Sequence, residues 1–386
     1  MPTLGHNPKP QQMNIDLLIT EIQPGGAERC CTQLAIYLNR KKHSVRVISI
    51  GPTPKSPHES LLWNSLLKHN IQVEFLNASK SIELPWARNK LLRLIRQSKP
   101  DIAQTFLWHA NLLGAWIYPK FQVPVVAGAR VREPRSYRSK LAWTWRNRVQ
   151  KVVCVSDEVA TWCSEHEGFS FDKLQVIPNG IDPPTNWKDP SNRSESSNSE
   201  EKILLFVGRL EEQKGIDILL EKAPSILQAL PEFQLVIIGQ GSWSLRWQQW
   251  LEESSFAHRV KLLGPRSDVM DWMRRSSLLV LPTRYEGMPN VVLEAMSLGL
   301  PIACMRVEGI SQLLGETLDE QSVSAQDWEA WEKLVIHLAK DPQTRKSLAI
   351  ANRDRVENHF KLDIQMQKYE LLYSEILGKI PGTSSI

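Results

Sequence analysis

The sequence predicts an α/β protein built from two doubly wound parallel sheets, and three observations carry this prediction. Short apolar runs alternate with helical patterns along the chain, which is typical of parallel sheets with helices on both faces. The chain has 386 residues, too many for one ordinary hydrophobic core. A long segment rich in Ser, Asn and Pro, residues 183–201, interrupts the pattern and is expected to be a linker.

The expected elements form one series on each side of that linker. Residues 1–12 predict a disordered N-terminus, 13–182 a first domain, 202–360 a second domain, and 361–380 a C-terminal helix. The strands expected in the first domain are Ile15–Thr20, Val45–Ile50, Val73–Leu76, Ile102–Thr105, Val123–Ala127 and Val152–Val155. Those expected in the second domain are Ile203–Val207, Gln234–Ile238, Val260–Leu262, Leu278–Leu281 and Pro301–Cys304. Ligands of such sheets bind at the carboxyl ends of the strands, so we expect functional residues in the loops that follow them.

Composition and charge indicate a globular protein with an anionic partner. The chain is 42% hydrophobic and 23% charged, and its five cysteines form no CxxC pair, which fits a reducing, cytoplasmic location. No apolar run approaches the ~20 residues of a spanning helix, so we expect a soluble chain or one lying on the inner face of a membrane. Residues 1–182 carry a net charge of +10 and the remainder −5, which favours a phospholipid surface, a polyprenyl-phosphate acceptor or a polyanionic glycan as partner. The chain shows no nucleic-acid-binding motif, so nucleic acid is not expected as a partner.

The most informative stretch runs from Leu278 to Pro301. Its apolar start predicts a buried strand, and Pro289 lies where a helix can begin, at the first-turn position that its fixed φ favours. A strand that leads through a loop into a helix N-terminus creates an anion site, because the N–H groups of residues 290–292 and the helix dipole face one point.

Two carboxylates bracket this anion site: Glu286 in the loop and Glu294, eight residues later, in the helix. Glu294 has apolar neighbours, and a buried carboxylate needs partners because burying it alone is unfavourable. The ribose hydroxyls of a nucleotide are suitable partners; a half-exposed Glu294 bonded to a Lys or a main-chain N–H is the alternative. Because the loop, the proline and Glu286 accompany Glu294, we interpret the segment as the donor-binding end of an enzyme.

The loop after the first strand of the second domain carries two cations. Arg209 and Lys214 lie five residues apart between Gly208 and the start of a helix. Two cations near a helix N-terminus can hold a diphosphate leaving group, although two solvated side chains are the alternative. Gly264, after a later strand, can present main-chain groups to a nucleobase. The chain contains no Asp-x-Asp pair for a divalent metal, so no metal is expected and the cations are expected to neutralise the leaving group.

Candidate residues of the first domain also follow expected strands. Gly25 and Gly26 precede a helix and let main chain approach a phosphate, although a plain tight turn fits them equally well. His109 follows the fourth strand and either faces the ligand or packs as a structural histidine beside a Trp. Arg130 and Arg132 follow the fifth strand and are either acceptor or phosphate contacts or parts of a solvated loop.

Residues 135–151 combine basic and aromatic side chains at helical spacing. Such a helix can rest on an anionic membrane surface. The alternative is a helix whose Trp face packs onto the domain and whose charged face lies in solvent. The sequence leaves both interpretations open.

Together these residues resemble a known family. From Met13 to Tyr373 the chain is similar to the retaining GT-B glycosyltransferases, most of all to family 4. The matching motifs are Gly25-Gly-Ala-Glu28, the His109-Ala-Asn111 loop, Val155-Ser156, Val176-Ile-Pro-Asn-Gly-Ile-Asp182, Val207-Gly-Arg209 with Lys214-Gly215, and Glu286-x7-Glu294. The resemblance implies two Rossmann-like domains facing each other across a cleft, with a C-terminal helix that crosses back to the first domain.

The resemblance also implies roles for individual residues. Arg209 and Lys214 would hold the donor diphosphate, Glu286 would contact the transferred sugar, Glu294 the ribose, and His109 would lie beside the reacting centre. Glu286, His109, Arg209 and Lys214 are thus the catalytic candidates. The expected donor site consists of Gly25, Gly26, Gly208, Arg209, Lys214, Gly264, Glu286, Gly287, Met288, Pro289, Asn290, Val291 and Glu294.

The sequence departs from the family at one turn. Where the family often has Gly-Gly-x-x-Glu, this chain has Arg306-Val-Glu308-Gly309-Ile-Ser-Gln312, so Glu308 is not expected in the site.

The leading hypothesis is transfer of a hexose from a nucleotide sugar to a glycan or lipid-linked acceptor, as in polysaccharide or lipopolysaccharide synthesis for a cell envelope. The transfer would retain the anomeric configuration and need no metal or other cofactor. A nucleotide-sugar epimerase of the same fold and a non-catalytic partner subunit are the alternatives.

Overall fold

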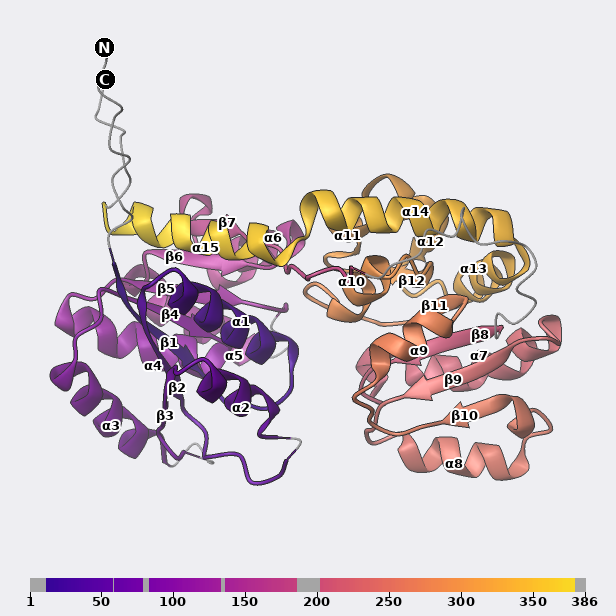
Figure 1. Cartoon of the computed structure of the whole chain (residues 1–386), viewed down its shortest axis with the longest axis horizontal. Helices are drawn as coiled ribbons and strands as arrows, with labels where there is room; N and C mark the ends of the chain where they lie inside the picture. Colours follow the sequence, from indigo (N-terminus) through magenta and orange to yellow (C-terminus); the bar gives the residue numbers. More distant parts are fainter. Residues whose placement is uncertain (1–11, 58, 79–82, 133–135, 186–201, 379–386) are drawn as a thin grey trace, which may run out of the picture. The chain divides into compact units, whose positions relative to one another are not determined.

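The computed structural model describes residues 12–57, 59–78, 83–132, 136–185 and 202–378, which fall into two compact units (Figure 1). One unit contains the described residues up to Pro178 and those from Gln365 onward; the other runs from Asn179 to Ile364. Residues 1–11 of the expected N-terminal segment, 186–201 of the expected linker and 379–380 of the expected C-terminal helix lie outside the described residues.

The first unit is built on a seven-stranded parallel sheet of order β3-β2-β1-β4-β5-β6-β7. Its strands are β1 (Asn14–Ile19), β2 (Ser44–Ser49), β3 (Gln72–Phe75), β4 (Ile102–Phe106), β5 (Val125–Ala129), β6 (Lys151–Cys154) and β7 (Leu174–Val176). Its helices are α1 (Gly26–Arg40), α2 (Leu61–Lys68), α3 (Leu84–Gln97), α4 (Trp108–Ile117), α5 (Ser136–Trp145) and α6 (Asp157–Glu167). β1 pairs with both β2 and β4, so the strand order reverses between β1 and β4, which is the switch point of the sheet.

The last described helix packs onto this first unit. α15 (Leu362–Ile376) contributes its residues from Gln365 onward. Glu370 accepts a hydrogen bond from the Tyr37 hydroxyl in α1 at 2.9 Å, and the Tyr373 hydroxyl donates to Oε1 of Gln104 in β4 at 3.1 Å. Both tyrosines and Gln104 therefore anchor the helix by specific polar contacts as well as by apolar burial.

The second unit repeats the design with a six-stranded parallel sheet of order β10-β9-β8-β11-β12-β13. Its strands are β8 (Ile203–Val207), β9 (Gln234–Ile238), β10 (Val260–Leu262), β11 (Leu278–Leu281), β12 (Ile302–Arg306) and β13 (Ser322–Ser324). Its helices are α7 (Ile216–Ala229), α8 (Ser244–Glu253), α9 (Val269–Arg275), α10 (Asn290–Ser297), α11 (Ile310–Leu314), α12 (Leu318–Gln321), α13 (Trp328–Lys340) and α14 (Pro342–His359). Here the order reverses between β8 and β11, so the switch point lies between these two strands.

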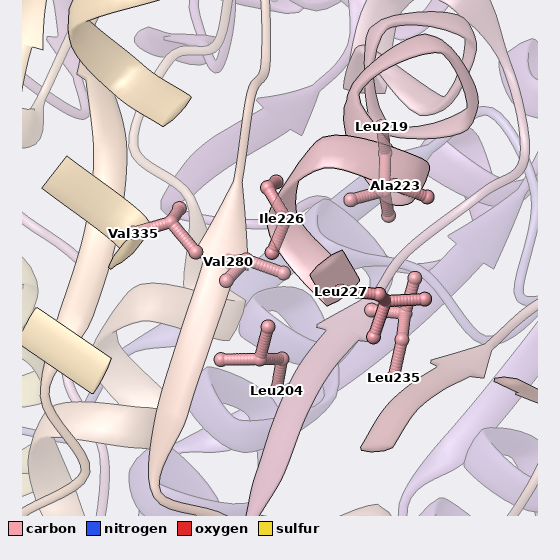
Figure 2. Close-up of a pocket in the computed structure, with 8 residues that line it drawn as sticks. All are labelled: Leu204, Leu219, Ala223, Ile226, Leu227, Leu235, Val280 and Val335. Carbon is pink, nitrogen blue, oxygen red and sulfur yellow. The ribbon is translucent and has the colours of Figure 1, made fainter. Parts of the chain in front are cut away.

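An apolar layer packs between the strands β8 and β11 and the helices next to them. Figure 2 shows the side chains that meet between β8, β9, β11 and the helices α7 and α13: Leu204, Leu219, Ala223, Ile226, Leu227, Leu235, Val280 and Val335. Every one of them is aliphatic. This layer is part of the hydrophobic core, and it fixes the strand ends from which the candidate site is built.

Two further features concern the whole described chain. All five cysteines are buried free thiols. No helix within the described ranges combines the length and apolar character that crossing a bilayer requires.

Candidate functional site

In the second unit, the loop after β8 (residues 208–215, the Lys214 loop) meets the loop after β11 (residues 282–289, the Glu286 loop). Both follow neighbouring strands at the switch point. Gly215 has φ +68°, and a Cβ there would lie 1.7 Å from the carbonyl oxygen of Pro282. Only glycine permits so close an approach, and it adopts this left-handed backbone conformation without strain, so the two loops are packed directly against each other.

Hydrogen bonds join the two loops. The N–H of Arg284 donates to the carbonyl oxygen of Gln213 at 2.8 Å, and Nε2 of Gln213 donates to the carbonyl oxygen of Tyr285 at 3.1 Å. Arg284 also forms a bidentate pair with Asp217 in α7, at 2.7 and 2.6 Å. Burial works to raise the pKa of Asp217, but the Arg284 hydrogen bonds and charge hold that pKa below its usual value. The loops are therefore fixed to each other and to the helix behind them.

Lys214 and Glu286 form an ion pair across the junction. Nζ of Lys214 contacts Oε1 of Glu286, and the side chains are only 15% and 10% exposed. Oγ1 of the fully buried Thr283 lies 3.1 Å from the same carboxylate oxygen and 3.0 Å from the carbonyl oxygen of Gln213. A pair this far withdrawn from water interacts more strongly than one on the surface. The structure thus brings two of the four catalytic candidates into contact.

Arg209 lies beside this pair. Its side chain is exposed, and Nη2 donates to Oε1 of Gln213 at 2.7 Å. Gln213 in turn bonds to the Glu286 loop, so Arg209 and Lys214 flank the same junction. In the described part of the chain Arg209 forms no ion pair, which leaves its charge available to an anionic ligand.

The start of α10 differs in detail from the sequence expectation. Pro289 is the cap residue before the helix, with φ −72° and ψ 109°, and lies outside the first turn where the sequence placed it. The N–H of Val292 donates to the Pro289 carbonyl at 3.1 Å, so it is not one of the free amides expected there. The N–H groups of Gly287, Met288, Asn290 and Val291 donate to no other described residue and form the main-chain part of the candidate anion site.

Asn179 supports this helix start and was given no role by the sequence. Its Nδ2 donates to Oδ1 of Asn290 at 2.7 Å and lies 3.4 Å from the carbonyl oxygen of Met288. Its own N–H lies 3.2 Å from the sulfur of Met288. The only sequence signal was the motif Val176–Asp182, which contains Asn179 but says nothing about its contacts.

Glu308 corrects the sequence analysis, which had left it outside the site. It follows β12, the strand next to β11, and is only 7% exposed. Its Oε2 accepts a hydrogen bond from the N–H of Glu286 at 3.0 Å. The sequence could not reveal this contact because it joins residues 22 positions apart, in a turn that departs from the family motif.

The remaining candidates of the second unit surround these loops. The N–H of Gly208 donates to the Ile238 carbonyl at 3.0 Å, and the Gly264 carbonyl accepts from the N–H of Gly239 at 2.9 Å, so the ends of β8, β9 and β10 are tied together. Gly264 has φ +67°, with open space where a Cβ would lie. Glu294 is half-buried, which is closer to the alternative considered for it than to a fully buried carboxylate.

In the first unit, Gly25 and Gly26 begin α1 at the carboxyl end of β1. Gly25 caps the helix in an extended conformation, and Glu28 lies so close that a Cβ at Gly25 would be 2.3 Å from Oε2 of Glu28. Burial raises the pKa of Glu28, and the charge of Arg130 works against that rise. The Gly-Gly turn, Glu28 and Arg130 therefore share one environment.

His109 is the second residue of α4, and the motif His109-Ala-Asn111 thus lies in a helix where the sequence expected a loop. Leu107, just before the helix, has φ +70°, a strained conformation for a bulky side chain and one often found at functional sites. His109 is half-buried, with its ring 5.0 Å from that of Trp108 in an edge-to-face arrangement.

Asn111 from the same motif has a structural role. It is buried, its Nδ2 donates to the Gly128 carbonyl at 2.9 Å, and its Oδ1 accepts from Thr105 Oγ1 at 2.7 Å and from the N–H of Gly128 at 3.2 Å. It thereby joins α4 to the ends of β4 and β5 and fixes the helix that carries His109.

The two acceptor candidates have different surroundings. Burial works to lower the pKa of Arg130, yet that pKa is raised because of Cys30, Tyr369 and Glu28 around it. The guanidinium of Arg132 is exposed and lies 4.6 Å from the ring of Trp162. Arg130 thus belongs to the Gly-Gly turn, whereas Arg132 belongs to the surface of α6.

α5 combines the two interpretations that the sequence left open. Ala142 and Trp145 are buried and pack onto the unit. On the outer side, Tyr137 and Trp143 are each 53% exposed, and Arg146 lies 3.9 Å from the Trp143 ring. We call this outer surface the basic-aromatic face; it consists of Trp116, Tyr137, Leu141, Trp143, Arg146 and Arg148.

Within the described ranges, no group of three or more His, Cys, Asp or Glu side chains is placed to hold a metal ion.

Comparison with known proteins gives matches over most of the chain. Residues 24–184 match the family model "Glycosyltransferase Family 4", and residues 188–355 match "Glycosyl transferases group 1". An Escherichia coli UDP-Gal:alpha-D-GlcNAc-diphosphoundecaprenol alpha-1,3-galactosyltransferase is 25% identical, with 74% of this chain and 78% of that enzyme covered. Glycogen synthase of Mycobacterium tuberculosis is 24% identical, with 82% of this chain and 77% of that enzyme covered.

Solved structures share the fold. The crystal structure of Anabaena HepE in complex with UDP and glucose superposes with a TM-score of 0.79 at 20% identity, with 94% of this chain and 100% of that chain covered.

Proposed function

The chain belongs to the glycosyl transferases of group 1 and family 4, has their two-domain GT-B fold and uses a nucleotide sugar; from this premise we propose that it transfers a hexose from a UDP-sugar to a lipid-linked or glycan acceptor. The transfer retains the anomeric configuration and needs no metal. UDP is chosen because the Anabaena neighbour was solved with UDP and glucose, and the Escherichia coli relative is named for a UDP-Gal donor.

One observation carries the proposal: the Lys214–Glu286 pair at the carboxyl ends of β8 and β11, next to the N-terminus of α10. A nucleotide sugar has a diphosphate beside a polyhydroxyl ring. Lys214, Arg209 and the main-chain N–H groups from Gly287 to Val291 suit the diphosphate. The Glu286 carboxylate accepts hydrogen bonds and suits the sugar hydroxyls. The diphosphate and the sugar of the donor thus each have complementary groups where the Lys214 loop meets the Glu286 loop.

The proposed reaction takes place on one face of the sugar. The bond between the sugar C1 and the diphosphate oxygen breaks, and a bond forms between C1 and the acceptor oxygen on the same face. The acceptor hydroxyl gives its proton to the departing phosphate oxygen. Negative charge grows on the diphosphate, and Lys214, Arg209 and the α10 N–H groups stabilise it from fixed positions. His109 at the start of α4 is proposed to lie beside the reacting centre.

Metal independence rests on the same cations. An ammonium, a guanidinium and a helix N-terminus together offer the positive charge that a divalent ion supplies to a leaving diphosphate in other enzymes. We expect turnover to survive EDTA and to gain nothing from added Mg²⁺ or Mn²⁺. Loss of turnover in EDTA, restored by either ion, would contradict this part of the proposal.

The acceptor is proposed to be anionic and lipid-linked, met at the cytoplasmic face of a membrane. Residues 1–182 carry +10, and the basic-aromatic face of α4 and α5 exposes Trp and Tyr rings next to arginines. Trp and Tyr rings favour the interface between membrane and water, and arginines are attracted to anionic headgroups, so this combination favours contact with an anionic bilayer surface. The Escherichia coli relative is named for a diphosphoundecaprenol-linked acceptor, whereas the glycogen synthase is named for a polysaccharide. A glycan acceptor is therefore the second arm of the test.

The proposal is tested first by donor binding. UDP-, GDP- and ADP-glucose and UDP-galactose are screened for an increase in the melting temperature, since a bound ligand stabilises by mass action. Wild type, Glu286→Gln and the surface control Glu320→Ala are then incubated with the stabilising donor and either a prenyl-diphosphate-linked sugar or a polysaccharide. We expect transfer by wild type and the control, with the anomer retained by NMR, and none by Glu286→Gln.

Other outcomes identify the alternatives. A free epimer of the donor without transfer indicates an epimerase. Donor neither bound nor hydrolysed indicates a non-catalytic partner subunit. Transfer by Glu286→Gln at the wild-type rate would overturn the assignment of this site.

A further inference from the structure

We propose that Glu308 is a positioning residue that sets the orientation of Glu286 toward the donor sugar. The proposal rests on the proposed function, in which the Glu286 carboxylate meets the sugar of the donor. Nothing in the sequence pattern points to Glu308; the contact between the loops after β11 and β12 does.

The main chain of Glu286 is held from one side by Glu308. Oε2 of Glu308 accepts the N–H of Glu286 at 3.0 Å, and the Glu308 side chain is buried, with the residue 7% exposed. A hydrogen bond to an ionised acceptor is about twice as strong as one between neutral groups. This bond fixes the point from which the Glu286 side chain departs.

The backbone next to Glu308 also packs against the Glu286 loop. Gly309 has φ +77°, and a Cβ there would lie 2.7 Å from the carbonyl oxygen of Gly287 and 2.8 Å from Cα of Met288. The turn 308–309 therefore lies directly on residues 287 and 288. A shift of Glu308 cannot be absorbed by empty space and is passed to the Glu286 loop.

The side chain of Glu286 is held from the other side by Lys214 and Thr283. The residue is thus fixed at both ends: its N–H by a carboxylate, and its own carboxylate by an ammonium and a hydroxyl. Because the Glu286 carboxylate is already oriented before the donor binds, little reorganisation of the site is needed during the reaction.

The test compares Glu308→Ala, Glu308→Gln, wild type and the surface control Glu320→Ala. UDP and UDP-glucose affinities are measured by calorimetry, with UDP-galactose in parallel, and kcat/KM is measured with the donor that turns over. For Glu308→Ala we expect about a tenfold loss in kcat/KM and in UDP-sugar affinity, the size of a lost charge-assisted hydrogen bond, with UDP affinity nearly unchanged. Glu308→Gln, which keeps the acceptor oxygen, is expected to recover most of the loss.

A role in general stability would give another pattern, because a loosened loop would weaken UDP and UDP-sugar equally. Equal losses for the two ligands, or Glu308→Gln as impaired as Glu308→Ala, would therefore overturn the proposal. So would wild-type activity in Glu308→Ala.

A second readout does not depend on the reaction. Amide hydrogen exchange over residues 283–289 is expected to quicken in Glu308→Ala and to stay near wild type in Glu308→Gln. Unchanged exchange in Glu308→Ala overturns the positioning role whatever the enzyme's substrate. Faster exchange together with no wild-type transfer from any UDP-hexose would instead refute the proposed function and leave the loop contact standing.

Discussion

Replacing Lys214 by Met, alone and together with Glu286→Gln, should separate the contribution of the ion pair to stability from the contribution of Lys214 to turnover. Lys214→Met leaves the Glu286 carboxylate without its cation, in surroundings where the two side chains are 15% and 10% exposed. Removing one partner of a buried ion pair costs about 3–5 kcal/mol, and partial exposure places this pair at about 3 kcal/mol. Each kcal/mol lowers Tm by about 2–4 °C in a unit of this size, so we expect a decrease of about 6–12 °C.

The double variant Lys214→Met/Glu286→Gln provides the matched control. It replaces both charges by neutral side chains of similar volume, which is commonly neutral for stability. We expect it to regain most of the lost Tm. Turnover should stay at least ~10²-fold below wild type in both variants, since the positive charge near the leaving diphosphate is absent from both.

The assay is calorimetry of thermal unfolding together with initial rates for the donor that binds. A Lys214→Met variant as stable as wild type would show that the contact between Lys214 and Glu286 carries little energy. A double variant as unstable as the single one would show that the loss comes from packing. Recovery of turnover in the double variant would refute the assigned role of Lys214.

The remaining predictions concern single positions. Gly215→Ala should lower the free energy of unfolding by well over ~2 kcal/mol because a Cβ meets the Pro282 carbonyl oxygen at 1.7 Å, whereas Gly264→Ala, with the same left-handed φ but open space, should lower it by only about 1 kcal/mol. Urea unfolding of both variants separates backbone strain from steric collision, and equal losses would contradict the close packing of Gly215 on Pro282. Asn111→Ala should lower the free energy of unfolding by about 2–4 kcal/mol because three buried hydrogen bonds are lost, while His109→Ala should lower turnover and leave Tm unchanged. A lower Tm in His109→Ala together with an unchanged Tm in Asn111→Ala would contradict the roles assigned to the two residues. The pKa of Glu370 is lowered mainly by its hydrogen bond with His43, so its stabilising effect is complete above the carboxyl's unfolded pKa and is lost as the pH falls through the folded one. Glu370→Gln should therefore lower Tm by a few degrees at pH 7, and this difference should shrink steadily as the pH falls below 4.5, the usual pKa of the carboxyl. A difference in Tm that does not change with pH would rule out this linkage.

The sequence predicted eleven of the thirteen strands of the described residues, including the two partly exposed edge strands β3 and β10. Eleven runs of apolar residues correspond to β1–β6 and β8–β12 within a few residues, because central strands of parallel sheets are apolar on both faces. β7 (Leu174–Val176) and β13 (Ser322–Ser324) were missed. Each has three residues and lies at a sheet edge, but β10 (Val260–Leu262) has the same length and an edge position and was predicted, so these two properties alone do not explain the misses.

The candidate site was predictable only as far as topology determines it. Lys214 and Glu286 lie 72 residues apart, yet both follow strands that the alternating pattern places in one sheet, so their meeting at one edge could be expected. The bonds that hold them could not. The hydrogen bonds of Glu308, Asn179 and the Arg284–Asp217 pair depend on how the loops pack against one another. The spacing of residues along the sequence does not predict that packing.

The charge pattern of the chain shows why local geometry decides where the proposed donor binds. Residues 183–386 carry a net charge of −5, which taken alone disfavours a diphosphate, while the excess of +10 lies in residues 1–182. At physiological ionic strength, charges more than about 8 Å from a ligand are largely screened, so distant acidic side chains matter little beside Lys214, Arg209 and the start of α10. An extended anionic partner responds differently, because it meets many basic residues at once and adds up their effects. The two signs therefore suit the two ligands proposed above: a compact donor held by a few fixed groups, and an extended anionic partner that the basic residues of 1–182 would attract.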